Sequence, residues 1–216
     1  MKKQISFQTS SPETNSPLKE YIYLSETKAS DKVDLAFATF QSWKKEPLAK
    51  RAELLKNIGM TLREQKEQAA KLMALEMGKP VVEGRAEIDK CAAACDYFSE
   101  NLENFLKPQD IKSGYHKSQI VKDPLGPIFA VMPWNFPFWQ VIRFAVPSLG
   151  IGNTVVLKHA DLVAGCGELI EEIFTKASGG LPLLQNAQVD HELAAILIAK
   201  PHIRGVTFTG STRGLG

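Results

Sequence analysis

Three short segments of the chain combine residue types that could take part in chemistry or hold a nucleotide. Asn135 lies among aromatic residues and two prolines in "MPWNFPFWQ". Lys158 and Asp161 stand three residues apart in "VVLKHAD", and Gly210 and Ser211 lie in "FTGST". An amide NH₂ near a helix N-terminus can donate to a developing oxyanion. A cation with a carboxylate could hold ribose hydroxyls, and a glycine beside a hydroxyl permits close approach to a phosphate.

Each segment also has a purely structural interpretation. Asn135 could satisfy backbone groups of a buried turn, and on its own this role weighs as much as the chemical one. A lysine after a strand is more often a solvated charge. "FTGST" alone is a weak signal. Their order, and their common location at the ends of successive expected strands, favour a shared site.

The second half of the chain alternates strand-length apolar runs with helical patterns. Strands are expected near 126–132, 153–158 and 204–208, bounded by Gly and Pro. Strand, helix and strand at this spacing are typical of parallel βαβ units. Ligands of such sheets bind beyond the carboxyl ends of the strands. The sequence therefore predicts an α/β fold in which the three segments face one cleft on the same side of the sheet.

The first half of the chain has a helical pattern. Apolar residues recur at three- and four-residue spacing from about Asp31 to Leu106, and one long helix from Leu48 is expected to stop at Gly78. A polar stretch punctuated by Gly and Pro follows, typical of a linker or projecting hairpin. The predicted organisation is 1–106 as a helical part, 107–123 as linker or oligomerisation hairpin, and 124–216 as a partial Rossmann-like domain.

Composition excludes several classes of partner. The 216 residues are 44% hydrophobic and 23% charged, with a formal net charge of +2 and both signs interspersed. This charge predicts no binding to nucleic acid or to an acidic membrane. No apolar run follows the N-terminal lysines, and the longest uncharged stretch, 144–157, is too short to span a bilayer. We expect a cytoplasmic protein whose partners are small molecules or other subunits.

The motifs together resemble the aldehyde dehydrogenase superfamily. "PWNFP", "GNTVVLKHA" and "VTFTGST" occur in the family's order, and "EMGKP" and "KDPLGPIFAVMPWNFPFW" are similar to its cofactor-binding domain. "LKHADLVAGCGELI" and "YFSENLENFL" look most like bacterial NAD(P)-dependent succinate-semialdehyde dehydrogenases. The resemblance implies N-terminal helices followed by a partial Rossmann-like parallel sheet. The chain has no GxGxxG fingerprint of ordinary dinucleotide-binding folds. Because the family also lacks this fingerprint, its absence does not argue against a bound dinucleotide.

The resemblance assigns roles to individual residues. It implies that Asn135 donates its amide to the oxyanion formed on the aldehyde, and that Lys158 binds the adenosine ribose. A carboxylate at Asp161 would pair with a free 2′-hydroxyl, which favours NAD over NADP as cofactor. The implied cofactor wall consists of Trp134, Asn135, Lys158, His159, Ala160, Asp161, Gly210 and Ser211. No metal is expected.

The chain departs from the family pattern in two ways. The family's nucleophilic cysteine and its glutamate base lie beyond the GSTxxG segment, and Leu215 replaces the second glycine of that motif. Cys91, Cys95 and Cys166 lie upstream in expected helices, so none is carried over as nucleophile, and burial is their first explanation. We expect a truncated product or one piece of a split gene that lacks the catalytic domain and is inactive alone.

Two classes of function remain from the sequence. The first is NAD(P)-dependent oxidation of an aldehyde, with succinate semialdehyde as the expected substrate, by a homo-oligomer in the full-length family. The alternative is a non-catalytic nucleotide-binding fragment or pseudoenzyme, and the DNA downstream of Gly216 would discriminate the two. An unrelated Rossmann-like binding protein would require three ordered motifs to be coincidence.

Overall fold

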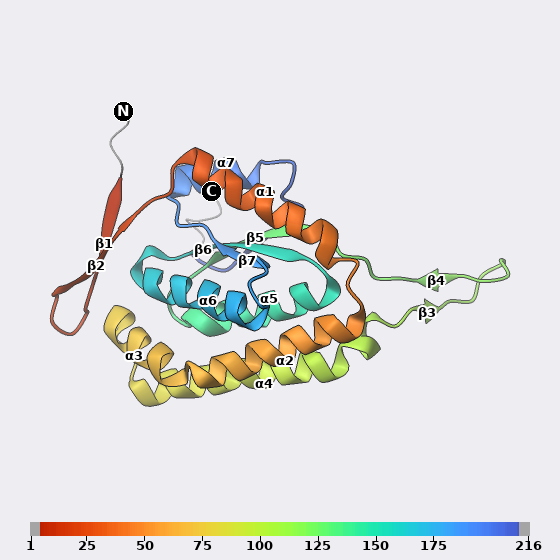
Figure 1. Ribbon diagram of the computed structural model, residues 1–216, viewed down its shortest axis with the longest axis horizontal. Coiled ribbons are helices and arrows are strands. Elements are labelled where there is room, and N and C mark those ends of the chain that lie inside the picture. Colours follow the sequence, from red (N-terminus) through yellow and green to blue (C-terminus); the bar gives the residue numbers. More distant parts are fainter. Residues whose placement is uncertain (1–4, 212–216) are drawn as a thin grey trace.

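The computed structural model describes residues 5–211 and is built around a four-stranded parallel sheet. The strand order is β7–β6–β5–β8 (Figure 1). The strands are β5 (Pro127–Met132), β6 (Thr154–His159), β7 (Leu184–Asn186) and β8 (Gly205–Phe208). From β5 the chain steps outward through β6 to β7 and then returns to place β8 on the other side of β5. The strand order therefore reverses between β5 and β8, which is the topological switch point of the sheet.

The three predicted strands are confirmed in position and in parallel direction. β5 pairs with β6 from Pro127 opposite Thr154, and with β8 from Ile128 opposite Gly205. The fourth strand, β7, was not predicted. Its three residues include Gln185 and Asn186, so it lacks the apolar run that marks the other strands, although all three are buried.

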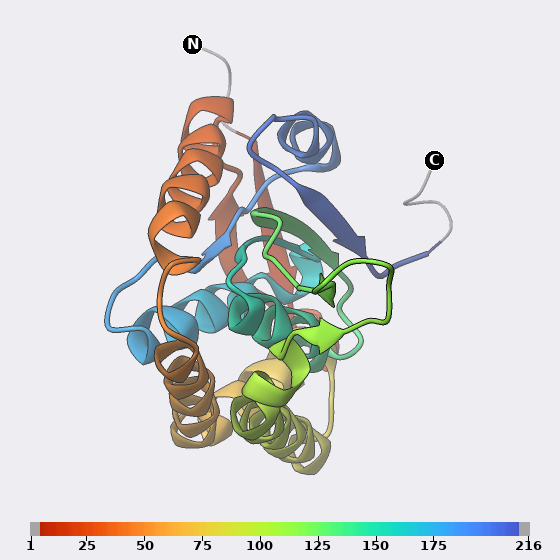
Figure 2. The same cartoon turned by 90° about the vertical axis from the view of Figure 1, so that its right-hand side faces the viewer.

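Helices cover both faces of the sheet (Figures 1 and 2). They enclose two apolar cores. The crossover helices α5 (Pro137–Ile151) and α6 (Ala164–Ala177) lie on one face, with a short 3₁₀ turn, η1 (Asp161–Val163), before α6. Helices α1 (Glu26–Trp43) and α7 (His191–Ile198) lie on the other. Alternation along the strands supplies both cores, because Phe129 and Val156 pack toward α1 and α7 whereas Ala130 and Leu157 pack toward α5 and α6.

A further helical layer packs beneath α5 and α6 (Figure 1). Its helices are α2 (Leu48–Glu64), α3 (Lys66–Met77) and α4 (Val81–Leu106). The expected single helix from Leu48 to Gly78 is wrong, because the chain breaks at Gln65 (φ −91°, ψ 6°) without a Gly or Pro to announce it. The predicted stop is confirmed at Gly78, whose left-handed backbone (φ 74°) suits glycine.

The helical layer also holds the far end of α5. A guanidinium nitrogen of Arg51, on α2, donates to the carbonyls of Gly150 and Ile151, and the Trp43 indole donates to the carbonyl of Leu149. The carbonyls of Gly150 and Ile151 end α5, where no N–H of the helix reaches them, whereas the Leu149 carbonyl also accepts from the Gly152 N–H at the C-cap. Residues of the N-terminal third therefore complete a helix of the C-terminal part.

Two antiparallel ribbons extend from this body. β1 (Ser6–Ser10) pairs with β2 (Pro17–Ile22), a ribbon that was not predicted, and β3 (Gln109–Asp110) pairs with β4 (Gln119–Ile120). The second ribbon projects far from the body (Figure 1) and falls within the predicted segment 107–123.

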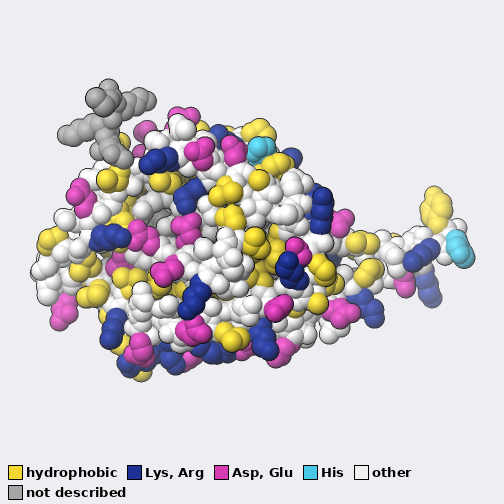
Figure 3. Space-filling model, viewed as in Figure 1, with side chains coloured by type: hydrophobic (Ala, Val, Ile, Leu, Met, Phe, Trp, Pro, Cys, Tyr) yellow, Lys and Arg dark blue, Asp and Glu magenta, His cyan; other side chains and the backbone are white. Residues whose placement is uncertain are grey.

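Charged side chains of both signs are interspersed over the face shown in Figure 3, in line with the small net charge. Within residues 5–211, no helix is long and apolar enough to cross a membrane. The same residues contain no cluster of three or more His, Cys, Asp or Glu side chains suited to a metal ion.

Candidate functional site

The predicted site residues collect at the carboxyl edge of the sheet. Beyond β5 and β8, at the switch point, a recess of about 230 Å³ is lined by Pro133, Trp134, Asn135, Thr209, Gly210 and Ser211. The Thr209 N–H donates to the Val131 carbonyl at 3.0 Å, which keeps the two strand ends side by side. The structure therefore brings Asn135 together with Gly210 and Ser211.

Asn135 is exposed at this edge, and its amide has a defined direction. Its Oδ1 accepts from the Phe136 N–H at 3.1 Å, and within residues 5–211 no group accepts from its Nδ2. The carbonyl half of the amide is therefore held by the backbone while the donor half stays available. The neighbouring Trp134 is 48% exposed and lies in the same recess.

Lys158 and Asp161 lie at the end of the neighbouring strand, β6. The Lys158 side chain is only 5% exposed, with Nζ 3.7 Å from Asp161 Oδ1 and 3.4 Å from the His159 carbonyl oxygen. Asp161 is more open, and its Oδ2 accepts from the Tyr23 hydroxyl at 2.6 Å. Burial, and after it the bond to Asp161, raises the pKa of Tyr23 well above its ordinary value, so the hydroxyl remains a donor.

His159 and Ala160 lie on the wall of a second, much smaller recess with Asp161. The His159 side chain is itself buried: Nδ1 accepts from the Ala160 N–H at 2.9 Å, and Nε2 lies 2.9 Å from the Pro137 carbonyl, to which it donates. Burial lowers the pKa of His159 to about 4, so the ring is neutral near pH 7. The imidazole thus ties the end of β6 to the start of α5.

Sequence reasoning missed the residues that hold the starts of α5 and α6. The residues that precede these helices, Phe136 and Val163, cap no N–H with their side chains. Instead, Glu87 Oε1 accepts from the N–H groups of Phe138 and Trp139, both at 2.9 Å. Its partner is the Lys79 ammonium, from the turn after α3.

Glu76 does the same for α6. Its carboxylate accepts from the N–H groups of Gly165 (2.8 Å) and Cys166 (3.0 Å), although it comes from the end of α3. No residue type signalled this role, because Asp161, an ordinary N-cap residue, stands directly before the stretch from Leu162 that is expected to be helical. Which distant carboxylate replaces the cap depends on tertiary packing.

The buried Glu76 carboxyl predicts a dependence of stability on pH. Burial raises its pKa above the ordinary 4.5, against the lowering effect of its backbone donors. The folded state then holds this proton more tightly than the unfolded state. The contribution of the protonated Glu76 to the free energy of unfolding is therefore full below pH 4.5 and is lost as the pH rises through the raised pKa. Urea unfolding of wild type and E76Q from pH 4.5 to neutrality should show wild type losing stability relative to E76Q. A constant or growing advantage of wild type would refute this.

The three cysteines lie away from the recess and are buried. Burial raises the pKa of the Cys95 thiol to about 12, and it raises the pKa values of Cys91 and Cys166 well above the ordinary 9.0. Thiols of this kind are inert at neutral pH, because the reactive form is the thiolate.

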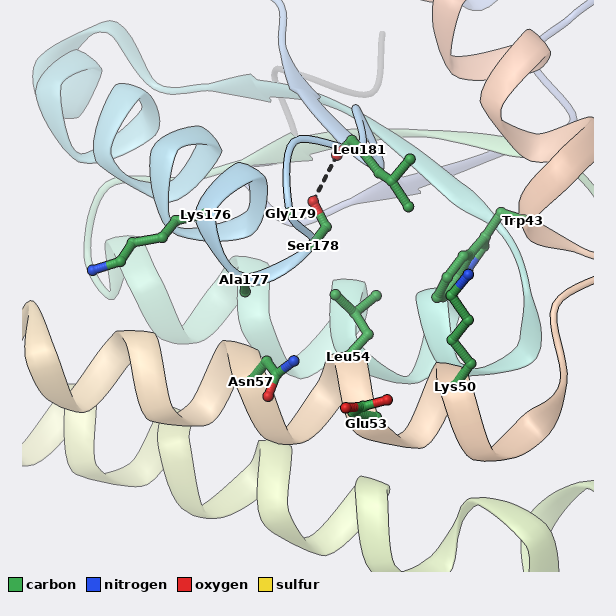
Figure 4. A pocket seen from close by; sticks show the side chains of 10 residues that line it. All are labelled: Trp43, Lys50, Glu53, Leu54, Asn57, Lys176, Ala177, Ser178, Gly179 and Leu181. Carbon is green, nitrogen blue, oxygen red and sulfur yellow. Dashed lines mark hydrogen bonds between the residues drawn. The ribbon is translucent and has the colours of Figure 1, made fainter.

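A larger groove, of about 370 Å³, lies between α2 and the turn that follows α6 (Figure 4). This turn leads into the start of β7, so the groove belongs to the opposite edge of the sheet from the predicted site. Two of its cations are already paired, Lys50 with Glu46 and Lys176 with Glu64. Its lining residues are Trp43, Lys50, Glu53, Leu54, Asn57, Lys176, Ala177, Ser178, Gly179 and Leu181. Nothing in this groove suggests chemistry.

A parallel sheet covered by helices on both faces, with polar residues gathered at its switch point, defines a doubly wound α/β domain. The sequence profile of the aldehyde dehydrogenase family matches residues 1–214. The chain belongs to this family.

Individual proteins similar to this chain support the family membership. The chain is 39% identical over 203 residues to a probable succinate-semialdehyde dehydrogenase [NADP(+)] of Synechocystis sp., covering 94% of the chain and 45% of the relative. It is also 39% identical, over 84% of the chain and 39% of the relative, to the succinate semialdehyde dehydrogenase [NAD(P)+] Sad of Escherichia coli. The crystal structure of succinic semialdehyde dehydrogenase from Streptococcus pyogenes with NADP+ superposes with a TM-score of 0.93 at 30% identity, covering 96% and 46% of the two chains.

The chain thus spans less than half the length of these relatives, matching their N-terminal part. Their names include NADP(+) or NAD(P)+, so they do not support the expected preference for NAD. Leu215, which replaces the second glycine of the GSTxxG motif, lies outside the described residues.

Proposed function

We propose that the chain is the cofactor-binding part of an NAD(P)-dependent aldehyde dehydrogenase whose substrate is succinate semialdehyde. The family membership supports the reaction class, and the named relatives support the substrate. In this proposal, 1–106 is the helical part of the cofactor-binding domain, 107–123 the hairpin through which copies pair, and 124–216 the partial Rossmann-like domain. The catalytic cysteine and glutamate are expected from the sequence that the relatives have beyond the matched part.

The observation that carries the proposal is the recess shared by Asn135, Gly210 and Ser211 at the switch point. Asn135 offers a free amide donor whose direction is fixed by the Phe136 N–H. An oxyanion forms on the aldehyde oxygen when a thiolate adds to the carbonyl carbon. A preorganised donor stabilises that charge by about 3–4 kcal/mol. We assign this role to Asn135.

The bound NAD(P)+ would accept the hydride from the substrate carbon. Lys158 and Asp161 would hold the adenosine ribose, with Ala160 and the backbone of His159 as the wall beside them. Gly210 and Ser211 would approach the phosphates and Trp134 the rest of the dinucleotide. The carboxylates of Glu87 and Glu76 already occupy the starts of α5 and α6, so neither helix start is free for a phosphate. This supports the end of β8 as the phosphate contact.

Nucleotide titration of the chain with Lys158 and Asp161 variants tests the cofactor assignment. K158M is expected to weaken NAD+ and NADP+ binding about tenfold, because a cation within reach of the ribose is lost. K176M is the matched control, since Lys176 lies at the opposite edge in an exposed pair with Glu64. D161N should improve NADP+ binding relative to NAD+, because the carboxylate repels a 2′-phosphate. Equal affinities for K158M and K176M would remove the assignment.

A second candidate is a nucleotide-binding chain without catalysis. The burial of Cys91, Cys95 and Cys166 favours it for the 216-residue polypeptide itself, because none presents a thiolate to the recess. Both candidates predict that the chain binds nucleotide and shows no turnover on its own, and they differ in whether the DNA downstream of Gly216 encodes the glutamate and cysteine motifs of the family.

A further inference from the structure

A buried ion pair lies directly beneath the segment that carries Asn135. The side chains of Lys79 and Glu87 are 6% and 2% exposed, and their ammonium and carboxylate groups are in contact. Lys79 follows α3 in the turn at Gly78, and Glu87 lies in the second turn of α4. Both therefore belong to the helical layer and reach the sheet edge from below.

The pair binds this segment on both sides of Pro137. Lys79 Nζ donates to the Asn135 carbonyl at 3.1 Å and lies 4.0 Å from the centre of the Phe136 ring. Glu87 Oε1 accepts from the N–H groups of Phe138 and Trp139. The cation thus holds the residue that offers the free amide, while the anion holds the helix start that follows it.

Stability alone does not account for such a pair. Desolvation of two ions is costly, and apolar residues of similar volume often stabilise a fold equally well. An apolar pair, however, could neither donate to the Asn135 carbonyl nor accept from the start of α5. What these two charges supply is a fixed backbone from Asn135 to Trp139.

The direction of the Asn135 amide depends on this backbone. Its Oδ1 is anchored to the Phe136 N–H, so rotation of that peptide would carry the free NH₂ away from the recess. Lys79 contacts the carbonyl of this same Asn135–Phe136 peptide bond. We propose that Lys79 and Glu87 are positioning residues that aim the Asn135 amide. This inference rests on the proposed oxyanion role of Asn135.

Amide hydrogen exchange and NMR of the ¹⁵N-labelled 216-residue chain test the inference without nucleotide or aldehyde. In the apolar double variant K79M/E87M, we expect the Phe138 and Trp139 amides to exchange at least about tenfold faster than in wild type, while the amides of β6 keep their protection. The Asn135 side-chain NH₂ signals should shift or broaden. The matched control is K66M, which removes an exposed Lys66–Asp89 pair between α3 and α4.

Other outcomes would overturn the inference. Unchanged Phe138 and Trp139 exchange, or a rise no larger than in β6, would show that the pair is only structural. The charge-swapped variant K79E/E87K should not restore the exchange protection of these amides, because a lysine at position 87 cannot accept from their N–H groups. Restored protection in this variant would also overturn the inference.

The conservative variants keep the test available if K79M/E87M does not fold. K79R retains the charge and donors, so it should keep the Asn135 NH₂ signals near their wild-type positions, whereas E87Q should shift them. Asn135 NH₂ signals that shift in K79R but stay in place in E87Q would contradict the inference. Nucleotide affinity is a separate readout, so a failure of the proposed function stays distinguishable from a failure of this inference.

Discussion

The 216-residue chain is expected to reduce neither NAD+ nor NADP+ when succinate semialdehyde is added, however well it folds. Aldehyde oxidation through a thiol adduct needs a thiolate within bonding reach of the carbonyl and a base for the hydrolysis step. Cys91, Cys95 and Cys166 are buried with raised pKa values and lie outside the recess that contains Asn135. One oxyanion donor contributes only about 3–4 kcal/mol and does not replace a nucleophile.

The absorbance of the reduced nicotinamide measures this outcome directly. The Escherichia coli relative serves as the positive control, and a variant with Cys91, Cys95 and Cys166 all changed to serine serves as the internal one. Turnover by the wild-type chain that disappears in the triple variant would identify one of these cysteines as a working nucleophile and refute the prediction.

The fold should lose about 3 kcal/mol of stability through His159 as the pH falls from 6.5 toward 4. Burial lowers the pKa of His159 from 6.5 to about 4, so the folded state binds this proton less tightly than the unfolded state. The contribution of the neutral His159 ring to the free energy of unfolding is therefore complete above pH 6.5. It is lost as the pH falls to the lowered pKa. The gap between the two pKa values corresponds to this free energy.

Urea unfolding at a series of pH values, compared between wild type and H159Q, isolates this term because other groups titrate in both proteins. Wild type should lose its advantage over H159Q as the pH falls. H116Q, which changes an exposed histidine in the β3–β4 segment, is the matched control and should run parallel to wild type. An H159Q profile parallel to wild type between pH 6.5 and 4 would contradict the prediction.

Much of the central sheet could be predicted because its signals are local. β5, β6 and β8 are apolar runs with Gly or Pro near their ends, and they appear within a residue of the expected positions. β7 could not be predicted, since Gln185 and Asn186 are buried there by the neighbouring β6 rather than by an apolar pattern. The break at Gln65 has no local signal either.

The candidate site also has a part that could be predicted from the sequence and a part that could not. The strand ends bring Asn135 and Ser211 into one recess because parallel neighbours end at a common edge. The carboxyl groups that hold the starts of α5 and α6, those of Glu87 and Glu76, could not be found from the sequence, because their partners are backbone N–H groups 51 to 90 positions away. Every residue except proline has a backbone N–H, so the residue type does not show which of these groups a distant carboxyl group will contact.

The attachment of α5 at both ends to the helical layer bears on how the chain folds. Glu87 holds its first turn and Arg51 its last, across sequence separations of 51 to 100 residues. The first N–H groups and the last two carbonyls of α5 therefore gain their protein partners only when α2 and α4 have docked. Such long-range closure is typical of slow, high-contact-order folding. Residues 1–106 and 124–211 should consequently unfold in one cooperative transition, so that neither is an autonomous folding unit.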